Sequence, residues 1–163
     1  MKTKILMFLT GFAGIAQSAL YYTMLPEKVA SHFGASGMPN SWMPRTGNFF
    51  VSSGIFILMT GIMYFTPKLA GKLPVRFINL PNREYWLAGE RKEQTFADIS
   101  VRMYIFGIAI NLFFIFLTHM VFLANMAKTV RLNDNAVLLA LGLYMFFTAG
   151  WLYSFIRRFR LKI

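Results

Sequence analysis

The 163-residue chain contains no cysteine and only six acidic residues, and both shortages narrow its chemistry. Without cysteine there are no disulfides, thiolate nucleophiles, iron–sulfur clusters or c-type haem attachments. The charged fraction is 14% and the hydrophobic fraction is 56%. An average soluble domain is about 25% charged. The composition therefore indicates a membrane protein.

Four long apolar segments are almost free of charge, at about residues 5–25, 49–66, 103–125 and 136–156. A helix needs roughly 20 apolar residues to cross the hydrocarbon layer, and buried backbone groups favour helices there. None of the segments alternates apolar and polar residues as barrel strands do. We predict an all-α membrane protein, a four-transmembrane-helix bundle forming a single membrane domain over residues 1–163.

The first segment has some features of a signal peptide, with two lysines before it and the small-residue sequence Ala16-Gln17-Ser18 within it. Its apolar character continues past that site to Leu25, which favours an uncleaved first helix.

Lysine and arginine are grouped at the ends of the apolar segments. With a cytoplasmic N-terminus, thirteen of the seventeen basic residues lie in cytoplasmic parts, Lys162 among them, and four lie on the opposite side. The positive-inside rule therefore predicts an N-in/C-in orientation. The same rule accounts for the net charge of +11, so no nucleic-acid partner is expected.

The predicted external loop, residues 26–48, follows the first span. A short helix over residues 27–33 is compatible with Pro26 at its first turn. The residues after it predict irregular structure: Gly34, Gly37, Pro39 and Pro44. Trp42 is expected at the headgroup level. Such a loop on a rigid bundle is either a recognition surface or a cover packed on the end of the bundle.

The predicted cytoplasmic segment, residues 67–102, is the largest part outside the spans. Tyr85 and Trp86 resemble an interfacial anchor. Residues 90–102 are compatible with a helix that runs into the third span, and the second external loop, residues 126–135, is short.

Small residues recur at intervals of four or seven within the spans, and such spacing lets helices approach closely in lipid. We predict that they face into a compact bundle: Thr10, Gly14, Ser18, Gly54, Gly61 and Gly142.

The intramembrane polar residues are Gln17, Asn111 and His119. Interhelical hydrogen bonds explain the first two. His119 is expected near the external headgroups, bonded to a neighbour. No acidic residue lies within a span to form a proton or ion path.

Residues that could bind a metal on the external side are few: Glu27, His32, His119 and Asp134. They match no known ligand spacing, and no motif of a hydrolase, phosphate loop or metallopeptidase is present. We predict no enzyme activity, no catalytic residue, no metal and no cofactor.

Two motifs resemble a known family. The first lies between the first two spans and comprises Leu25-Pro26, His32-Phe33, Gly37, Pro39 and Trp42. The second is cytoplasmic and comprises Leu80, Pro81, Asn82, Arg83, Glu84, Tyr85, Trp86, Glu90 and Arg91. Together they resemble the DUF1648 family, bacterial membrane proteins related to SdpI-type toxin-immunity proteins. Asn40 and Arg45 depart from it, since the family often has Asp and Lys there.

The resemblance implies a multi-pass protein of the bacterial inner membrane, with His32, Gly37, Pro39 and Trp42 as ligand- or partner-binding positions. SdpI-type proteins protect cells from a secreted peptide toxin and sequester a repressor. The favoured hypothesis is a binding, immunity or sensor protein whose partners are the lipid bilayer and a peptide ligand or membrane protein. A small accessory subunit of a larger membrane complex is the alternative, and an enzyme or transporter is a third.

Overall fold

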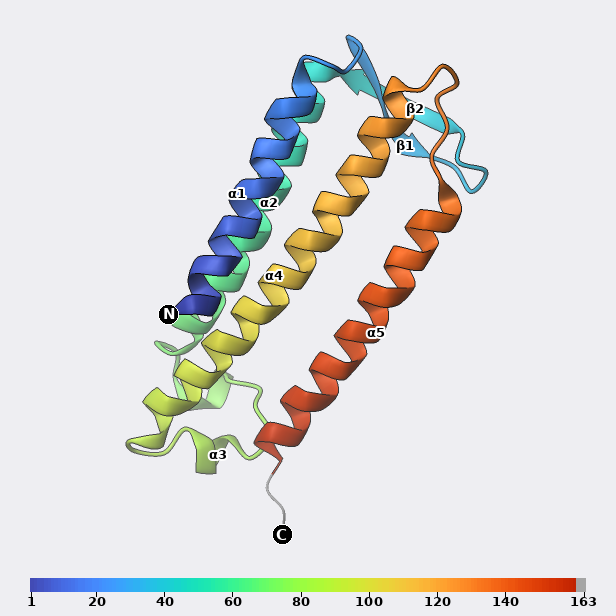
Figure 1. Cartoon of the computed structure of the whole chain (residues 1–163). Helices are drawn as coiled ribbons and strands as arrows, with labels where there is room; N and C mark the ends of the chain where they lie inside the picture. Colours follow the sequence, from blue (N-terminus) through green and yellow to red (C-terminus); the bar gives the residue numbers. More distant parts are fainter. Residues whose placement is uncertain (161–163) are drawn as a thin grey trace.

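The computed structural model describes residues 1–160, so Lys162 lies outside the described residues. Its elements follow in chain order: α1 Lys2–Tyr22, β1 Lys28–Phe33, β2 Pro39–Pro44, α2 Arg45–Ala70, the 3-10 helix η1 Val75–Phe77, α3 Arg83–Trp86, α4 Arg91–Met126 and α5 Asp134–Phe159. The long helices run side by side, with the β-hairpin at one end of the bundle and α3 at the other (Figure 1). The N-terminus and the end of α5 lie toward the α3 end.

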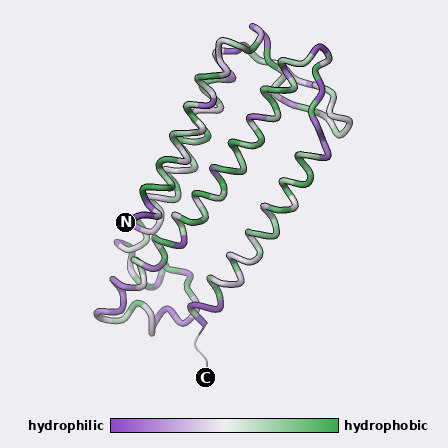
Figure 2. The backbone as a smooth tube through the Cα atoms, in the orientation of Figure 1, coloured by the Kyte–Doolittle hydropathy of each residue, from purple (hydrophilic) through white to green (hydrophobic). Residues whose placement is uncertain are grey.

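All four long helices are long and apolar enough to cross a membrane, which confirms the predicted four-helix membrane fold. The hydropathy colouring follows the same division, with mostly apolar helices and polar residues gathered toward the two ends (Figure 2). The helices α2, α4 and α5 extend beyond their predicted spans at both ends, whereas α1 begins before its predicted span and ends within it, at Tyr22. The longest, α4, begins at Arg91, so the predicted continuation of residues 90–102 into the third span is confirmed.

The helices α1, α2 and α4 pack against one another, whereas α5 packs mainly against α4. Small residues make the close approaches in the three-helix core. A Cβ added at Gly14 would lie 2.3 Å from the Phe56 ring, and one at Gly107 would lie 2.6 Å from Sδ of Met7. These contacts are typical of helices that associate in lipid through close packing.

The prediction that Gly54, Gly61 and Gly142 face into the bundle is wrong. No other part of the described chain lies within 4 Å of a Cβ built at any of the three. The buried stripe of α2 follows a spacing of four residues instead: Asn48, Ser52, Phe56 and Thr60. Gly54 and Gly61 therefore lie on other faces of that helix.

The segment predicted as a short helix over residues 27–33 is a β-strand, so that prediction is wrong. β1 pairs antiparallel with β2, with Ala30 opposite Trp42 and irregular register around His32. Pro39 and Pro44 stand at the two ends of β2, where a missing N–H is tolerated. The same prolines and glycines that predicted an irregular loop bound two strands and their turn.

A small apolar cluster lies at each end of the bundle. Leu25, Val29 and Phe122 join the hairpin to α1 and α4. The α3 end has a second cluster, formed by residues of the connecting segment and the last helix: Ile78, Leu80, Leu87 and Phe159. The segments outside the spans are thus packed onto the helices at both ends.

Candidate functional site

The hairpin is joined to the bundle through the side chain of Asn125 at the end of α4. The backbone N–H of Ala30 donates to Asn125 Oδ1 at 2.7 Å, and Asn125 Nδ2 donates to the Ala30 carbonyl at 3.1 Å. Both residues are buried. The amide therefore pairs with β1 as a neighbouring strand would, and it satisfies two backbone groups that burial would otherwise leave without partners.

The tip of the hairpin is attached to the loop between α4 and α5 at Gly37. Its carbonyl accepts a hydrogen bond from the Leu132 N–H at 2.9 Å, and Arg131 Nε donates to the Ser36 carbonyl at 3.2 Å. Gly37 has φ of +70°, and a Cβ there would lie 2.4 Å from the Leu132 carbonyl oxygen. Only glycine fits both the backbone conformation and the contact, so Gly37 holds the tip in place.

The base of the hairpin is fixed by Arg45, the first residue of α2. Its Nη1 donates to the Leu25 carbonyl at 3.0 Å, and its backbone N–H donates to the Glu27 carbonyl at 2.8 Å. The guanidinium lies 4.9 Å from the centre of the Tyr22 ring, within cation–π range. With Asn125 and Gly37, this gives the hairpin three separate attachments to the rest of the chain.

Several side chains of this fixed hairpin are exposed, two of them from the sequence motif, His32 and Trp42. Trp42 is 48% exposed, Met38 is 49% exposed, and His32 and Asn40 are also exposed. Within residues 1–160 neither the imidazole of His32 nor the indole of Trp42 makes a hydrogen bond. Pro39 is only half-buried and begins β2. We call His32, Met38, Asn40 and Trp42 the hairpin face.

The intramembrane polar residues join helices of the three-helix core. Asn111 is fully buried, and its Nδ2 lies 3.3 Å from the Met7 carbonyl, 3.3 Å from Thr10 Oγ1 and 3.1 Å from Thr60 Oγ1. The amide thus links α4 to both α1 and α2.

The expected interhelical bonds of Gln17 and His119 are also present. Gln17 Nε2 donates to the Ile115 carbonyl at 3.2 Å, and His119 Nδ1 lies 3.0 Å from the Tyr21 hydroxyl. The Ser18 hydroxyl instead donates to the Gly14 carbonyl within α1, at 3.0 Å. These groups therefore serve helix association and local backbone contacts in this structure.

The second sequence motif binds the end of α5. Asn82, with φ of 53°, donates from Nδ2 to the Phe159 carbonyl at 3.0 Å, and Trp86 Nε1 donates to the same oxygen at 2.8 Å. The last carbonyls of a helix lack partners within it, so these donors cap α5. Thr95 Oγ1 in turn donates to the Trp86 carbonyl at 2.9 Å.

Two other members of that motif, Arg91 and Tyr85, contact each other. Arg91 Nε donates to the Tyr85 carbonyl at 2.9 Å, and its guanidinium lies 4.1 Å from the Tyr85 ring centre. Pro81 stands directly before Asn82, and Glu90 precedes the first residue of α4 without a side-chain cap bond. Within the motif, Asn82 and Trp86 are therefore explained by their bonds to α5, and Arg91 by its contacts with Tyr85.

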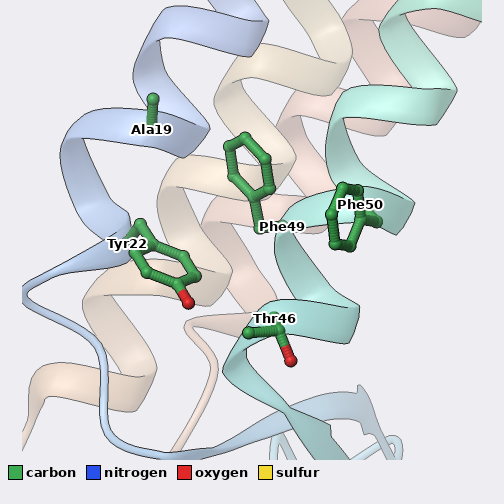
Figure 3. Close-up of a pocket in the computed structure, with 5 residues that line it drawn as sticks. All are labelled: Ala19, Tyr22, Thr46, Phe49 and Phe50. Atoms are coloured by element: carbon green, nitrogen blue, oxygen red, sulfur yellow. The ribbon is translucent and has the colours of Figure 1, made fainter.

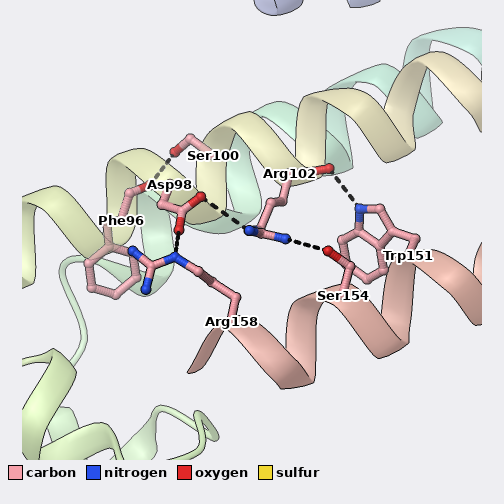
Figure 4. Close-up of polar contacts among 7 residues, drawn as sticks. All are labelled: Phe96, Asp98, Ser100, Arg102, Trp151, Ser154 and Arg158. Carbon is pink, nitrogen blue, oxygen red and sulfur yellow. Dashed lines mark hydrogen bonds and ion pairs between the residues drawn. The ribbon is translucent and has the colours of Figure 1, made fainter. Parts of the chain in front are cut away.

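One charged cluster, centred on Asp98, was missed by the sequence analysis (Figure 4). Asp98 Oδ1 lies 3.1 Å from Arg102 Nε, and its Oδ2 lies 2.8 Å from Arg158 Nε on α5. Arg102 Nη1 also donates to Ser154 Oγ at 3.2 Å, and Trp151 Nε1 donates to the Arg102 carbonyl at 3.1 Å. The i,i+4 spacing of Asp98 and Arg102 could have predicted their ion pair. Nothing in the sequence predicts the contacts with Arg158, Ser154 and Trp151 on α5.

An apolar pocket of about 320 Å³ lies between α1 and α2 near the hairpin, lined by Ala19, Tyr22, Thr46, Phe49 and Phe50 (Figure 3). The rings of Tyr22 and Phe49 pack edge to face, with their centres 5.7 Å apart. The pocket presents no ionisable group other than the Tyr22 phenol. Among the residues the structure describes, no three His, Asp or Glu side chains gather to hold a metal ion.

Four apolar helices with a compact hairpin at one end define a multi-pass membrane protein. Residues 9–57 match the family model described as "Domain of unknown function (DUF1648)". The match spans most of α1, the whole hairpin and the first half of α2, and it confirms the predicted resemblance to that family over this segment. No curated protein and no solved structure matches the chain.

Proposed function

We propose that the protein is a non-enzymatic binding protein of the bacterial inner membrane that recognises a peptide or envelope component through the hairpin face. The observation that carries the proposal is that the hairpin has a fixed backbone but leaves side chains of its sequence motif exposed. Its backbone is attached to the rest of the chain through Asn125, Gly37 and Arg45. The imidazole of His32 and the indole of Trp42 are exposed on it. Functional residues are concentrated on loops that a rigid scaffold positions.

The charge distribution supports an extracytoplasmic hairpin. Thirteen of the seventeen Lys and Arg residues fall in segments that would be cytoplasmic when the hairpin is outside. In short connecting segments this excess orients membrane proteins. An N-in/C-in arrangement then presents the hairpin face to molecules arriving from outside the cell.

Labelling of single cysteines tests the orientation, and the cysteine-free chain provides a clean background. Ser36→Cys places a thiol at the exposed tip of the hairpin, and Glu90→Cys places one at the opposite end. An impermeant maleimide added to intact cells or spheroplasts should label position 36 and leave position 90 unlabelled until lysis. The reverse pattern would place the hairpin in the cytoplasm and remove the basis for external recognition.

The ligand proposed is a secreted peptide, by similarity to the immunity role implied for SdpI-type proteins. The segment that matches the family includes every residue of the hairpin face. Exposed aromatic and imidazole side chains suit a peptide, since they provide apolar contact area and hydrogen bonding together.

A complementation assay tests this function. Cells lacking the gene, carrying either the wild type or a His32→Ala/Trp42→Ala double variant, are exposed to peptides secreted by neighbouring bacteria. We expect the wild type to protect and the double variant to fail at equal membrane abundance. Phe146→Ala, which changes an 81% exposed aromatic on α5, is the matched control and should protect fully. Full protection by the double variant would refute the proposal.

An accessory subunit of a larger membrane complex is the second candidate, and the position of α5 favours it. None of the residues in the apolar window of α5 is buried. An adjacent membrane protein has room to pack there. Purification in a mild detergent separates the two functions, because a subunit should retain partners in a fixed ratio.

A further inference from the structure

Two ammonium groups converge on one tyrosine ring near the N-terminal end of α1. Lys68 Nζ lies 3.8 Å and Lys4 Nζ lies 5.1 Å from the centre of the Tyr64 ring. Lys68 also donates to the Tyr64 hydroxyl. Neither lysine belongs to any of the ion pairs found within residues 1–160. Two like charges held around one ring, without a carboxylate, form a site with an unmatched positive charge.

An apolar groove begins directly beside these lysines. Phe8 is one turn along α1 from Lys4. Its ring packs edge to face on the Tyr64 ring, with the ring centres 5.3 Å apart. Phe8 also lines a groove of about 330 Å³ between α1 and α2. The other groove residues continue toward the middle of both helices: Gly11, Phe12, Ile15, Phe56, Ile57, Thr60, Gly61 and Phe65.

Gly61 keeps part of this groove open. A Cβ at that position would meet no other part of the described chain within 4 Å. The absence of a side chain here is therefore not explained by contact with another helix of this chain. The open space leaves room for an occupant outside the chain to lie against the α2 backbone, and Gly61 also lines the groove.

We propose that the Lys4–Tyr64–Lys68 cluster and the adjoining groove bind one anionic phospholipid, with its phosphate at the two ammonium groups and an acyl chain along the groove. The location of the cluster fits this ligand. Lys4 is in the first turn of α1 and Lys68 is in the last turn of α2. Both therefore lie at the boundary of the apolar spans, where lipid phosphates lie. Basic pockets beside transmembrane helices are a recurring form of lipid headgroup recognition.

The charged groups should provide the selectivity, and the groove should provide the fit. An acyl chain that moves from bulk lipid into an apolar groove gains little hydrophobic free energy, since both surroundings are apolar. The preference for an anionic over a zwitterionic lipid must then come from Lys4 and Lys68. The groove contributes close packing, which distinguishes one bound lipid from a diffuse attraction to a charged surface.

The test uses the full chain in a mild detergent, with phosphatidylglycerol or phosphatidylcholine added at equal concentration. Native mass spectrometry counts the retained lipid molecules and gives relative affinities. For the wild type we expect one preferentially retained phosphatidylglycerol. Lys4→Gln/Lys68→Gln should weaken its binding about 30-fold, from the usual contribution of a basic residue near an anionic lipid. Lys2→Gln/Lys92→Gln removes the same charge away from Tyr64 and should leave binding within a few-fold.

A second pair of variants tests the groove without altering charge. Gly61→Leu fills the groove and should abolish the single retained lipid. Gly54→Leu is its matched control, because Gly54 lies on the same helix, also meets nothing within 4 Å and does not line the groove. Unchanged melting temperatures of both variants would show that the fold is preserved.

Three results would overturn the proposal. They are equal retention of both lipids by the wild type, equal losses in the two lysine double variants, and undiminished phosphatidylglycerol binding by Gly61→Leu. The last two would indicate a diffuse attraction between an anionic surface and the basic end of the protein.

Discussion

Replacing Asn125 with alanine should release the hairpin from the bundle. The substitution removes both hydrogen bonds between the side-chain amide and the backbone of Ala30. Ala30 has no exposed surface, so its N–H and C=O would lose their partners in a buried site. Each unsatisfied buried group costs about 1–3 kcal/mol. Two such groups predict a local destabilisation of about 2–4 kcal/mol, because water that reaches the freed N–H and C=O would recover part of the cost.

Hydrogen exchange followed by mass spectrometry measures this effect. A local loss of 2.8 kcal/mol is about a hundredfold in the opening equilibrium. The peptide covering β1 should therefore exchange about 30- to 1,000-fold faster in the variant, given the range above. Peptides from the middle of α1 should keep their wild-type rates, because the hairpin lies outside the three-helix core.

Asn135→Ala is the matched control, since Asn135 is exposed near the start of α5 and makes none of these bonds. Its β1 exchange should equal that of the wild type. Unchanged β1 protection in Asn125→Ala would refute the reasoning, and it would show that the attachments at Gly37 and Arg45 hold the hairpin without the amide.

Three further substitutions probe the packing. Gly37→Ala should cost about 1–3 kcal/mol of unfolding free energy, from its positive φ and its clash with the Leu132 carbonyl. Gly34→Ala, with no contact closer than 3.8 Å, should cost less than half as much. Gly14→Leu should lower the melting temperature in detergent by overfilling the contact with α2, whereas Gly54→Leu should not. Asp98→Asn should speed proteolysis of the α5 end by weakening both arginine contacts, and unchanged proteolysis would contradict this.

The helices could be predicted from the sequence because each one carries its own signal. A long apolar segment must satisfy its backbone internally in lipid, so its composition alone predicts a helix. The continuation of α4 back to Arg91 was also visible, because residues 90–102 are free of helix-breaking residues. Family resemblance could be recognised for a similar reason, since its motif residues lie close together in the sequence.

The hairpin could not be predicted because its stability comes from distant residues. Residues 27–33 contain nothing that excludes a short helix. What makes them a strand is pairing with β2 and with Asn125, whose side chain lies 95 positions further along the chain. Prolines and glycines in the segment indicated chain reversals, but they did not distinguish an irregular loop from two short strands.

Some of the candidate residues were predicted correctly and others were not, again because their partners are distant in the sequence. Small-residue spacing shows that helices could approach closely, but it does not show which face meets a neighbour. Gly14 packs against α2, while Gly61 faces an open groove. The motif around Asn82 and Trp86 was visible as a pattern, but its partner is the carbonyl of Phe159, more than seventy residues away.

The central claim is that the hairpin face binds a ligand that is not a fixed subunit. The most direct test is mild-detergent purification of the tagged wild type and of Trp42→Ala from native membranes, with mass spectrometry of all retained molecules. We expect the wild type to retain a peptide or envelope component that the variant loses. Membrane proteins retained in a fixed ratio, and equally by both chains, would contradict it.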